Sequence, residues 1–259
     1  MVDSHCHLAD PAFAADLEAV VGRARDAGLT RALCIVTAGD SAELTRAVDV
    51  ARMWPEVRFS AGIHPHVAGQ YAERLDTVTA VVNDALASVP LTRAIGEIGL
   101  DYHHDLSPRD VQREVFRTQV ALARELKLPI VIHTREAEAD TIEILRQEGH
   151  GEVTGVFHCF TGDQHAARRA LDLGFLVSFA GILTFPRAAD LRDAARVVPE
   201  ESLLAETDSP YLAPVPFRGR RNEPVWVGRV FDTLAEIRGA PRSRIVEQVT
   251  ANLTRLLRL

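Results

Sequence analysis

The sequence predicts an α/β fold, a single-domain (β/α)8 barrel of the TIM type that spans residues 1–259. Three observations lead to this prediction. Eight short apolar runs alternate with segments of helical periodicity, and no linker or low-complexity stretch interrupts them. The runs are continuously apolar instead of alternating, which is typical of parallel strands buried on both faces. Eight such units in 259 residues match the usual size of this barrel.

Each expected strand is an apolar run that leads into polar residues. The strands are placed at Val2–His7, Ala32–Thr37, Val57–His64, Ala94–Leu100, Pro129–His133, Gly155–Cys159, Phe175–Phe179 and Leu203–Thr207. The helices that follow are placed at Pro11–Ala27, Ser41–Met53, Tyr71–Ala87, Pro108–Leu126, Glu136–Gln147, Asp163–Leu173, Pro186–Val198, Pro224–Arg238 and Ser243–Arg258.

The helix over 108–126 has the clearest start signal. Ser107 suits the N-cap, Pro108 suits the first helical position, and Asp110 falls three residues after the cap. A doubly wound open sheet is the alternative architecture. The first strand is not followed by a glycine-rich dinucleotide-binding motif, which argues against that alternative.

Composition and charge exclude several classes of protein. Hydrophobic residues make up 47% and charged residues 25%, which excludes a disordered, collagen-like or disulfide-stapled chain. We expect neither a membrane span nor a signal peptide, and three cysteines without CxxC spacing fit reduced thiols of a cytoplasmic protein. Cys6 and Cys159 flank possible ligands, and we expect both to serve packing. The net charge of −7 argues against broad nucleic-acid binding, although a metal or a local basic loop can still attract phosphate.

Histidines and carboxylates gather at the ends of the expected strands. His5 and His7 end the first strand, and their spacing of two places both imidazoles on one side of it. Glu97 lies in the fourth strand among glycine and apolar neighbours, where a carboxylate is costly to bury without a cation. Three further residues end or follow the fifth, sixth and eighth strands: His133, His158 and Asp208.

Each of these residues alone has an ordinary interpretation, such as a hydrogen-bonded core histidine or a buried ion pair. Together they favour a metal site, because the carboxyl ends of barrel strands form the active site of TIM-barrel enzymes. Four imidazoles and two carboxylates exceed what one catalytic zinc needs, so we predict two divalent ions. The predicted assignment gives one ion to His5, His7 and Asp208, the other to His133 and His158, and makes Glu97 the bridge.

Such a pair of ions can activate water and stabilise the leaving oxygen in phosphoester hydrolysis. Asp208 faces the same pocket, so it can also accept the proton of the attacking water. Glu206 shares that face and can orient a histidine or a water molecule from behind the ligands. His64 ends the third strand, where it either touches the substrate or serves the turn beside Pro65. Asp101 and His103 follow the fourth strand, where they could line the pocket, but a solvated loop is favoured for both.

A basic cluster follows the eighth strand in an otherwise acidic chain. It consists of Arg218, Arg220 and Arg221. The cluster is either a solvated loop or a contact for substrate phosphate beside the metals.

Seven segments, in order along essentially the whole chain, add a more specific signal. They are DSHCHL (3–8), GIHPH (62–66), AIGEIGLDYH (94–103), SPRDVQREVF (107–116), PIVIHTREA (129–137), GVFHCFTGD (155–163) and LLAETDSPYLAPVPFRGRRNEP (203–224). Together they resemble the TatD family of metal-dependent DNases within the amidohydrolase-like barrel superfamily. The resemblance implies a binuclear centre and hydrolysis of DNA phosphodiesters, commonly as a 3′-to-5′ exonuclease on single strands.

The family's metal ligands map onto the six residues already singled out, and Glu97 replaces the bridging lysine of the wider superfamily. The ligand chemistry suits Zn, Mn, Ni, Co or, less well, Mg. The resemblance implies that the substrate is DNA. We expect no membrane partner, and a monomeric chain is favoured. Two alternatives remain open at this point. One is an amidohydrolase or lactonase that uses the same site on a carbonyl; the other is a binding protein with an inactive site.

Overall fold

In the computed structural model, which describes residues 1–259, eight parallel strands follow one another around one sheet in the order β1 to β8. Their bounds are β1 Val2–Cys6, β2 Arg31–Thr37, β3 Arg58–Gly62, β4 Thr92–Asp101, β5 Ile130–Arg135, β6 Gly155–Phe157, β7 Leu176–Phe179 and β8 Leu203–Ala205. Backbone bonds from Asp208 N to His5 O (2.9 Å) and from His7 N to Ser209 O (2.7 Å) join the segment after β8 to β1. The predicted (β/α)8 barrel is confirmed.

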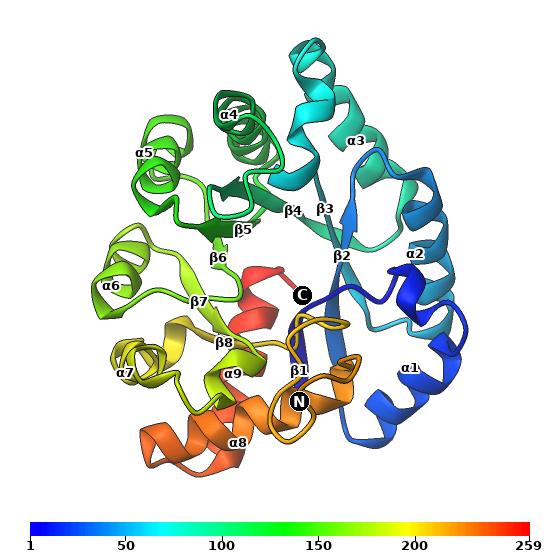
Figure 1. The fold of residues 1–259 in the computed structure, drawn as a ribbon. Coiled ribbons are helices and arrows are strands. Elements are labelled where there is room, and N and C mark those ends of the chain that lie inside the picture. Colours follow the sequence, from blue (N-terminus) through cyan, green and yellow to red (C-terminus); the bar gives the residue numbers. More distant parts are fainter.

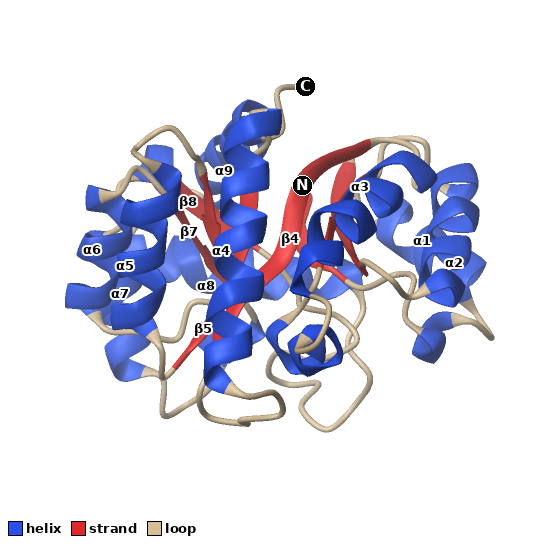
Figure 2. Ribbon diagram, turned by 90° about the horizontal axis from the view of Figure 1, so that it is seen from above, coloured by secondary structure: helices blue, strands red, loops and turns tan.

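Helices surround the strands, as Figures 1 and 2 show. Their bounds are α1 Leu17–Asp26, α2 Ser41–Met53, α3 Val78–Ser88, α4 Arg109–Leu126, α5 Glu138–Gly149, α6 Gln164–Asp172, α7 Ala189–Val197, α8 Val227–Arg238 and α9 Arg242–Leu256. None of these helices combines the length and apolarity needed to cross a bilayer.

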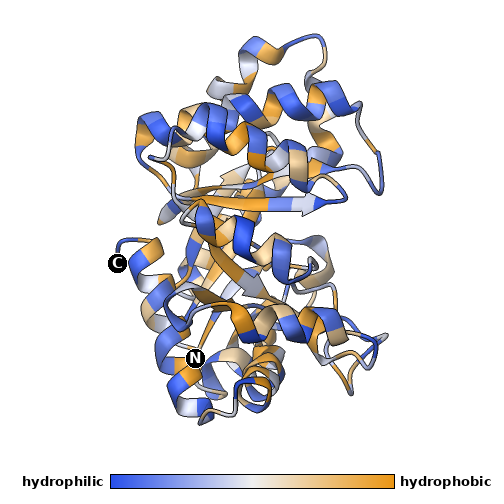
Figure 3. Cartoon of the chain, turned by 90° about the vertical axis from the view of Figure 1, so that its left-hand side faces the viewer, coloured by the Kyte–Doolittle hydropathy of each residue, from blue (hydrophilic) through white to orange (hydrophobic).

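The core follows from the apolar strands. Residues Ala32 to Val36 of β2 and Ala94 to Asp101 of β4 are all buried, because the barrel interior covers one face of the strands and the helices cover the other. Figure 3 shows the helices with hydrophobic and hydrophilic residues interleaved around their turns. The three cysteines are free thiols, as predicted.

Several element boundaries differ from the prediction. The expected helix over Pro11–Ala27 is a short 3-10 turn at Pro11–Phe13 followed by α1, and the expected helix over Tyr71–Ala87 begins only at Val78. Ser107 was predicted to cap α4, which instead begins after Pro108 without a side-chain cap. The Ser107 hydroxyl donates to His66 O (3.0 Å) and accepts from Gly69 N (2.9 Å). This serine therefore joins the loop after β4 to the loop after β3.

Two buried glutamines of α4 bind the strand ends. Gln119 accepts from Ile63 N (2.7 Å) and donates to Ile63 O (3.1 Å), just beyond β3. Gln112 accepts from Asp101 N (2.9 Å) and donates to Asp101 O (3.1 Å), at the end of β4. Each amide satisfies backbone groups that lie where the ladder ends, so α4 fixes the positions from which His64 and Asp101 project.

We predict that Gln119→Leu lowers the free energy of unfolding by about 2–6 kcal/mol. The substitution keeps the volume but leaves a buried N–H and a buried C=O of Ile63 unpaired, at about 1–3 kcal/mol for each group. Urea unfolding measures the change. The matched control Gln147→Leu alters an exposed glutamine of α5 and should stay within about 0.5 kcal/mol of the parent. Equal stability of the two variants would contradict the role assigned to Gln119.

Candidate metal centre

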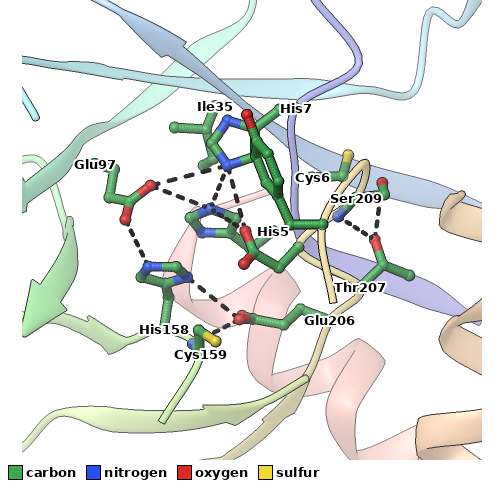
Figure 4. A network of polar contacts seen from close by, with 12 residues as sticks. His5, Cys6, His7, Ile35, Glu97, His158, Cys159, Glu206, Thr207 and Ser209 are labelled. Atoms are coloured by element: carbon green, nitrogen blue, oxygen red, sulfur yellow. Dashed lines mark hydrogen bonds and ion pairs between the residues drawn. The ribbon is translucent and has the colours of Figure 1, made fainter. Parts of the chain in front are cut away.

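The six predicted ligands converge at the carboxyl ends of the strands. His5 lies in β1 and Glu97 in β4, and His133 lies in β5. The other three stand just beyond strand ends: His7, His158 and Asp208. The strands β1, β6 and β8 end one or two residues earlier than expected, so His7 and His158 follow their strands instead of ending them. Figure 4 shows the side chains of His5, His7, Glu97 and His158 directed toward one another.

Glu97 is aimed by an irregularity in β4. In the pairing with β5, Gly96 faces Val131 and Ile98 faces Ile132, so Glu97 is the extra residue of a bulge. Gly99 has a φ of 143°, and a β-carbon there would lie 1.9 Å from the backbone oxygen of His133. The glycine thus lets β4 and β5 approach closely beside the carboxylate.

One carboxylate oxygen of Glu97 contacts three imidazole rings. Its Oε1 atom lies 2.7 Å from His133 Nδ1, 2.7 Å from His158 Nε2 and 3.2 Å from His64 Nε2. The Oε2 atom lies 3.4 Å from His5 Nε2 and 3.9 Å from His7 Nε2. A carboxylate oxygen has only two lone pairs, so three imidazole nitrogens exceed what hydrogen bonding at Oε1 can satisfy.

A second set of nitrogen and oxygen atoms meets on the other side of Glu97. The Nε2 atoms of His5 and His7 lie 3.2 Å apart, and Asp208 Oδ1 lies 3.6 Å and 3.4 Å from them. His5 Nδ1 is buried without a partner. Five imidazoles around one carboxylate cannot all be charged in a buried site, and if they are neutral their lone pairs crowd together. Divalent cations accept these lone pairs, so the donor set fits metal ions.

The electrostatics separate the histidines. Burial raises the pKa of Glu97, but the imidazoles of His158 and His64 outweigh it and hold that pKa well below its usual value. Burial lowers the pKa of His64 to about 4. For His7, burial acts in the same direction, yet the nearby Asp208 carboxylate dominates and raises its pKa to about 9. Glu97 is therefore ionised, and His64 is neutral at pH 7.

Buried carboxylates stand behind two of the predicted ligands. Glu206 Oε1 lies 3.3 Å from His158 Nδ1 and accepts from Cys159 N (2.6 Å). Asp101 Oδ2 lies 3.2 Å from His133 Nε2. The other ring nitrogen of each histidine faces Glu97. Each ring is therefore held between two carboxylates, which fixes its orientation.

The expectation of a solvated loop is wrong for Asp101, whose side chain is fully buried. Its burial was hidden in the sequence because it depends on Gln112 of α4, 11 residues further along the chain. The expectation holds for His103, which is exposed and faces Glu136.

Asp3 is a second residue whose place the sequence did not reveal. It is fully buried and accepts from Thr207 Oγ1 (2.6 Å) and Thr207 N (2.9 Å). Burial raises its pKa to about 8, although the hydrogen bonds from Thr207 oppose the shift. The contact joins β1 to the segment after β8 and thereby fixes the position of His5 relative to Asp208. Asp3 stands two residues before His5, as Glu206 stands two before Asp208, and that spacing was the available signal.

The three arginines of the basic cluster have different surroundings. Arg221 donates to both oxygens of Asp16 (2.7 Å each) and to Glu223 (3.2 Å), which raises its pKa. The guanidinium of Arg218 lies over the ring of Phe185, 4.1 Å from its centroid, and the residue is exposed. Arg220 is exposed and has no side-chain hydrogen bond or ion pair. Arg221 thus anchors the loop, whereas Arg218 and Arg220 remain accessible.

A parallel barrel with histidines and carboxylates at the carboxyl ends of its strands is the arrangement expected of a metal-dependent hydrolase. Comparison with known proteins specifies the family. The model of the family described as "TatD related DNase" matches residues 2–258. The chain belongs to the TatD family of metal-dependent hydrolases.

Individual relatives agree with this assignment. The uncharacterized metal-dependent hydrolase YabD of Bacillus subtilis is 39% identical, over 100% of this chain and 99% of that protein. The 3′-5′ ssDNA/RNA exonuclease TatD of Erwinia tasmaniensis is 35% identical over 100% of both chains. The crystal structure of the TatD homologue YjjV of Escherichia coli K12 has a TM-score of 0.88 and 30% identity, covering 100% of this chain and 98% of that one.

Proposed function

We propose that the protein hydrolyses phosphodiester bonds of DNA with two divalent metal ions and acts as a 3′-to-5′ exonuclease on single strands. The observation that carries this proposal is the pair of ligand sets on either side of Glu97. One ion would be held by His5, His7 and Asp208 and the other by His133 and His158, with Glu97 between them. The name of the Erwinia relative supports the choice of nucleic acid and the direction of digestion.

Two bound divalent ions supply positive charge that stabilises the attacking and leaving oxygens of an in-line displacement. The residues of the chain supply the remaining steps. Asp208 is ionised, because the neighbouring imidazoles outweigh burial and keep its pKa below the usual value. Its side chain is 12% exposed, so it can accept the proton of the attacking water. Glu206 holds His158, and Asp101 holds His133, in the orientation that binding a metal ion requires.

His64, Arg218 and Arg220 are proposed to contact the substrate. Neutral His64 accepts from His66 N (3.1 Å) at Nδ1, so its proton lies on Nε2, which faces Glu97 Oε1 at 3.2 Å. A phosphate oxygen that enters beside Glu97 can share this N–H group. The two accessible arginines follow β8 on the same side of the barrel and can hold phosphates further along the strand. This local charge is needed because the chain as a whole carries a net charge of −7.

For the proposed activity, we predict that Asp208→Asn lowers kcat on end-labelled single-stranded DNA by at least 10²–10⁴-fold, since the substitution removes both a proton acceptor and a ligand. Glu97→Gln should abolish most activity, because the neutral amide does not offset two dications. Asp208→Asn should still bind DNA nearly normally, whereas Glu97→Gln should lose the paired metal site together with its activity. The control Asp172→Asn changes an exposed aspartate of α6 and should keep the parental rate.

The same assay with a chelator, and with ester and amide substrates in parallel, discriminates between classes of reaction. Metal-dependent cleavage of esters or amides without cleavage of DNA would contradict the proposal and favour the amidohydrolase or lactonase alternative. Wild-type cleavage of DNA by Asp208→Asn would contradict the role of this residue.

For the basic loop, we predict that Arg218→Ala/Arg220→Ala raises KM for DNA and leaves metal content and hydrolysis of a small phosphodiester unchanged. Each lost phosphate contact should also reduce the salt dependence of DNA binding by about one unit of slope. Arg146→Ala, an exposed arginine of α5, is the matched control. Equal KM values for the double variant and the parent would show that the loop is merely solvated.

A further inference from the structure

A second cluster of histidines lies beside the centre described above and has no part in the proposed assignment of ions. His66 follows β3, and Asp101 and His104 lie at and after the end of β4. Asp101 Oδ2 is 2.7 Å from His66 Nε2 and 2.7 Å from His104 Nδ1. The donor atoms of the three residues all lie within 4.8 Å of one another.

The Asp101 carboxylate has more nitrogen neighbours than it has lone pairs. Its Oδ1 atom accepts from the backbone N–H groups of His103 (3.0 Å) and His104 (2.8 Å), which uses both lone pairs of that oxygen. Its Oδ2 atom faces His133 Nε2 at 3.2 Å in addition to His66 and His104. Two lone pairs therefore face three imidazoles, so hydrogen bonds alone leave one imidazole nitrogen unmatched.

We infer that His66, Asp101 and His104 bind a third divalent cation, separate from the two that flank Glu97. A cation between the three residues uses the lone pairs of two neutral imidazoles and one carboxylate oxygen, so the oxygen no longer has to accept from every ring. Two histidines and one carboxylate are a known ligand set for zinc and for other first-row metals with open coordination positions.

The surroundings hold this cluster in place and leave one side open. Gln112 fixes the backbone of Asp101, and Ser107 donates to the backbone oxygen of His66. The Asp101 side chain is 0% exposed, whereas those of His66 and His104 are 31% and 45% exposed. The protein thus supplies one buried and two partly exposed ligands, and solvent or a bound molecule can reach the remaining positions.

His133 separates the third site from the first two. Its Nδ1 atom faces Glu97 at 2.7 Å, and its Nε2 atom faces Asp101. A cation at the third site adds positive charge close to the binuclear centre, where a polyanionic strand would enter. That consequence rests on the proposed function, whereas the cation site itself does not.

The test is a count of bound Zn²⁺. Metal-free protein is equilibrated with Zn²⁺ at a buffered free concentration, and bound zinc per folded chain is measured by mass spectrometry. His66→Ala/His104→Ala should bind about one ion fewer than the parent. The matched control His103→Ala/His165→Ala removes two exposed histidines and should bind as many ions as the parent.

Two further variants keep the result decisive. His5→Ala/His7→Ala should lose zinc at the centre but retain the ion that depends on His66 and His104, so failure of the binuclear proposal is distinguishable from failure of this one. The single variant His104→Ala, at a largely exposed side chain, should show the same loss of about one ion if the double variant does not fold. An unchanged zinc count in folded His104→Ala or in the double variant, or an equal loss in the control, would overturn the inference.

Discussion

The rest of the site depends on one constraint, which is that the charged carboxylate of Glu97 is buried. This carboxylate lies at the centre of the barrel mouth with imidazoles from four neighbouring loops or strands around it, and its side chain is only 6% exposed. An ionised carboxylate at that depth is costly unless cations or hydrogen-bond donors surround it. The bulge in β4 directs this carboxylate inward. Gly96 and Gly99 lie on either side of the bulge, where β5 comes too close to leave room for a side chain.

Successive groups of residues hold the side chains around Glu97 in place. The six predicted ligands lie at the strand ends, and behind them Asp101, Glu206 and Asp3 hold imidazoles or neighbouring strand ends through buried hydrogen bonds. Behind these carboxylates, the amides of α4 bind the backbone itself. These contacts hold the rings of His133 and His158 in place before any ion binds, whereas His5 Nδ1 and Glu206 Oε2 are buried without a partner.

The sequence predicted the architecture and the six residues that converge at the strand ends, because both follow from local patterns. Apolar runs mark the strands, and the spacing of His5 and His7, or the placing of His133 after Ile130–Ile132, is visible within a few residues. The roles of Asp101 and His66 were not visible, because they arise where the loops after β3 and β4 meet, through Ser107 and Gln112. The commitment of Arg221 to Asp16 was hidden for the same reason, since about 200 residues separate the partners.

The most direct test of the account is anomalous diffraction from crystals of the protein loaded with Zn²⁺ or Mn²⁺. The account predicts two strong peaks on opposite sides of the Glu97 carboxylate, about 3.5–4 Å apart, with His5, His7 and Asp208 around one and His133 and His158 around the other. The third cation inferred above would add a separate peak among His66, Asp101 and His104 and does not bear on this pair. A single peak, or a pair of ions that does not share Glu97, would contradict the account.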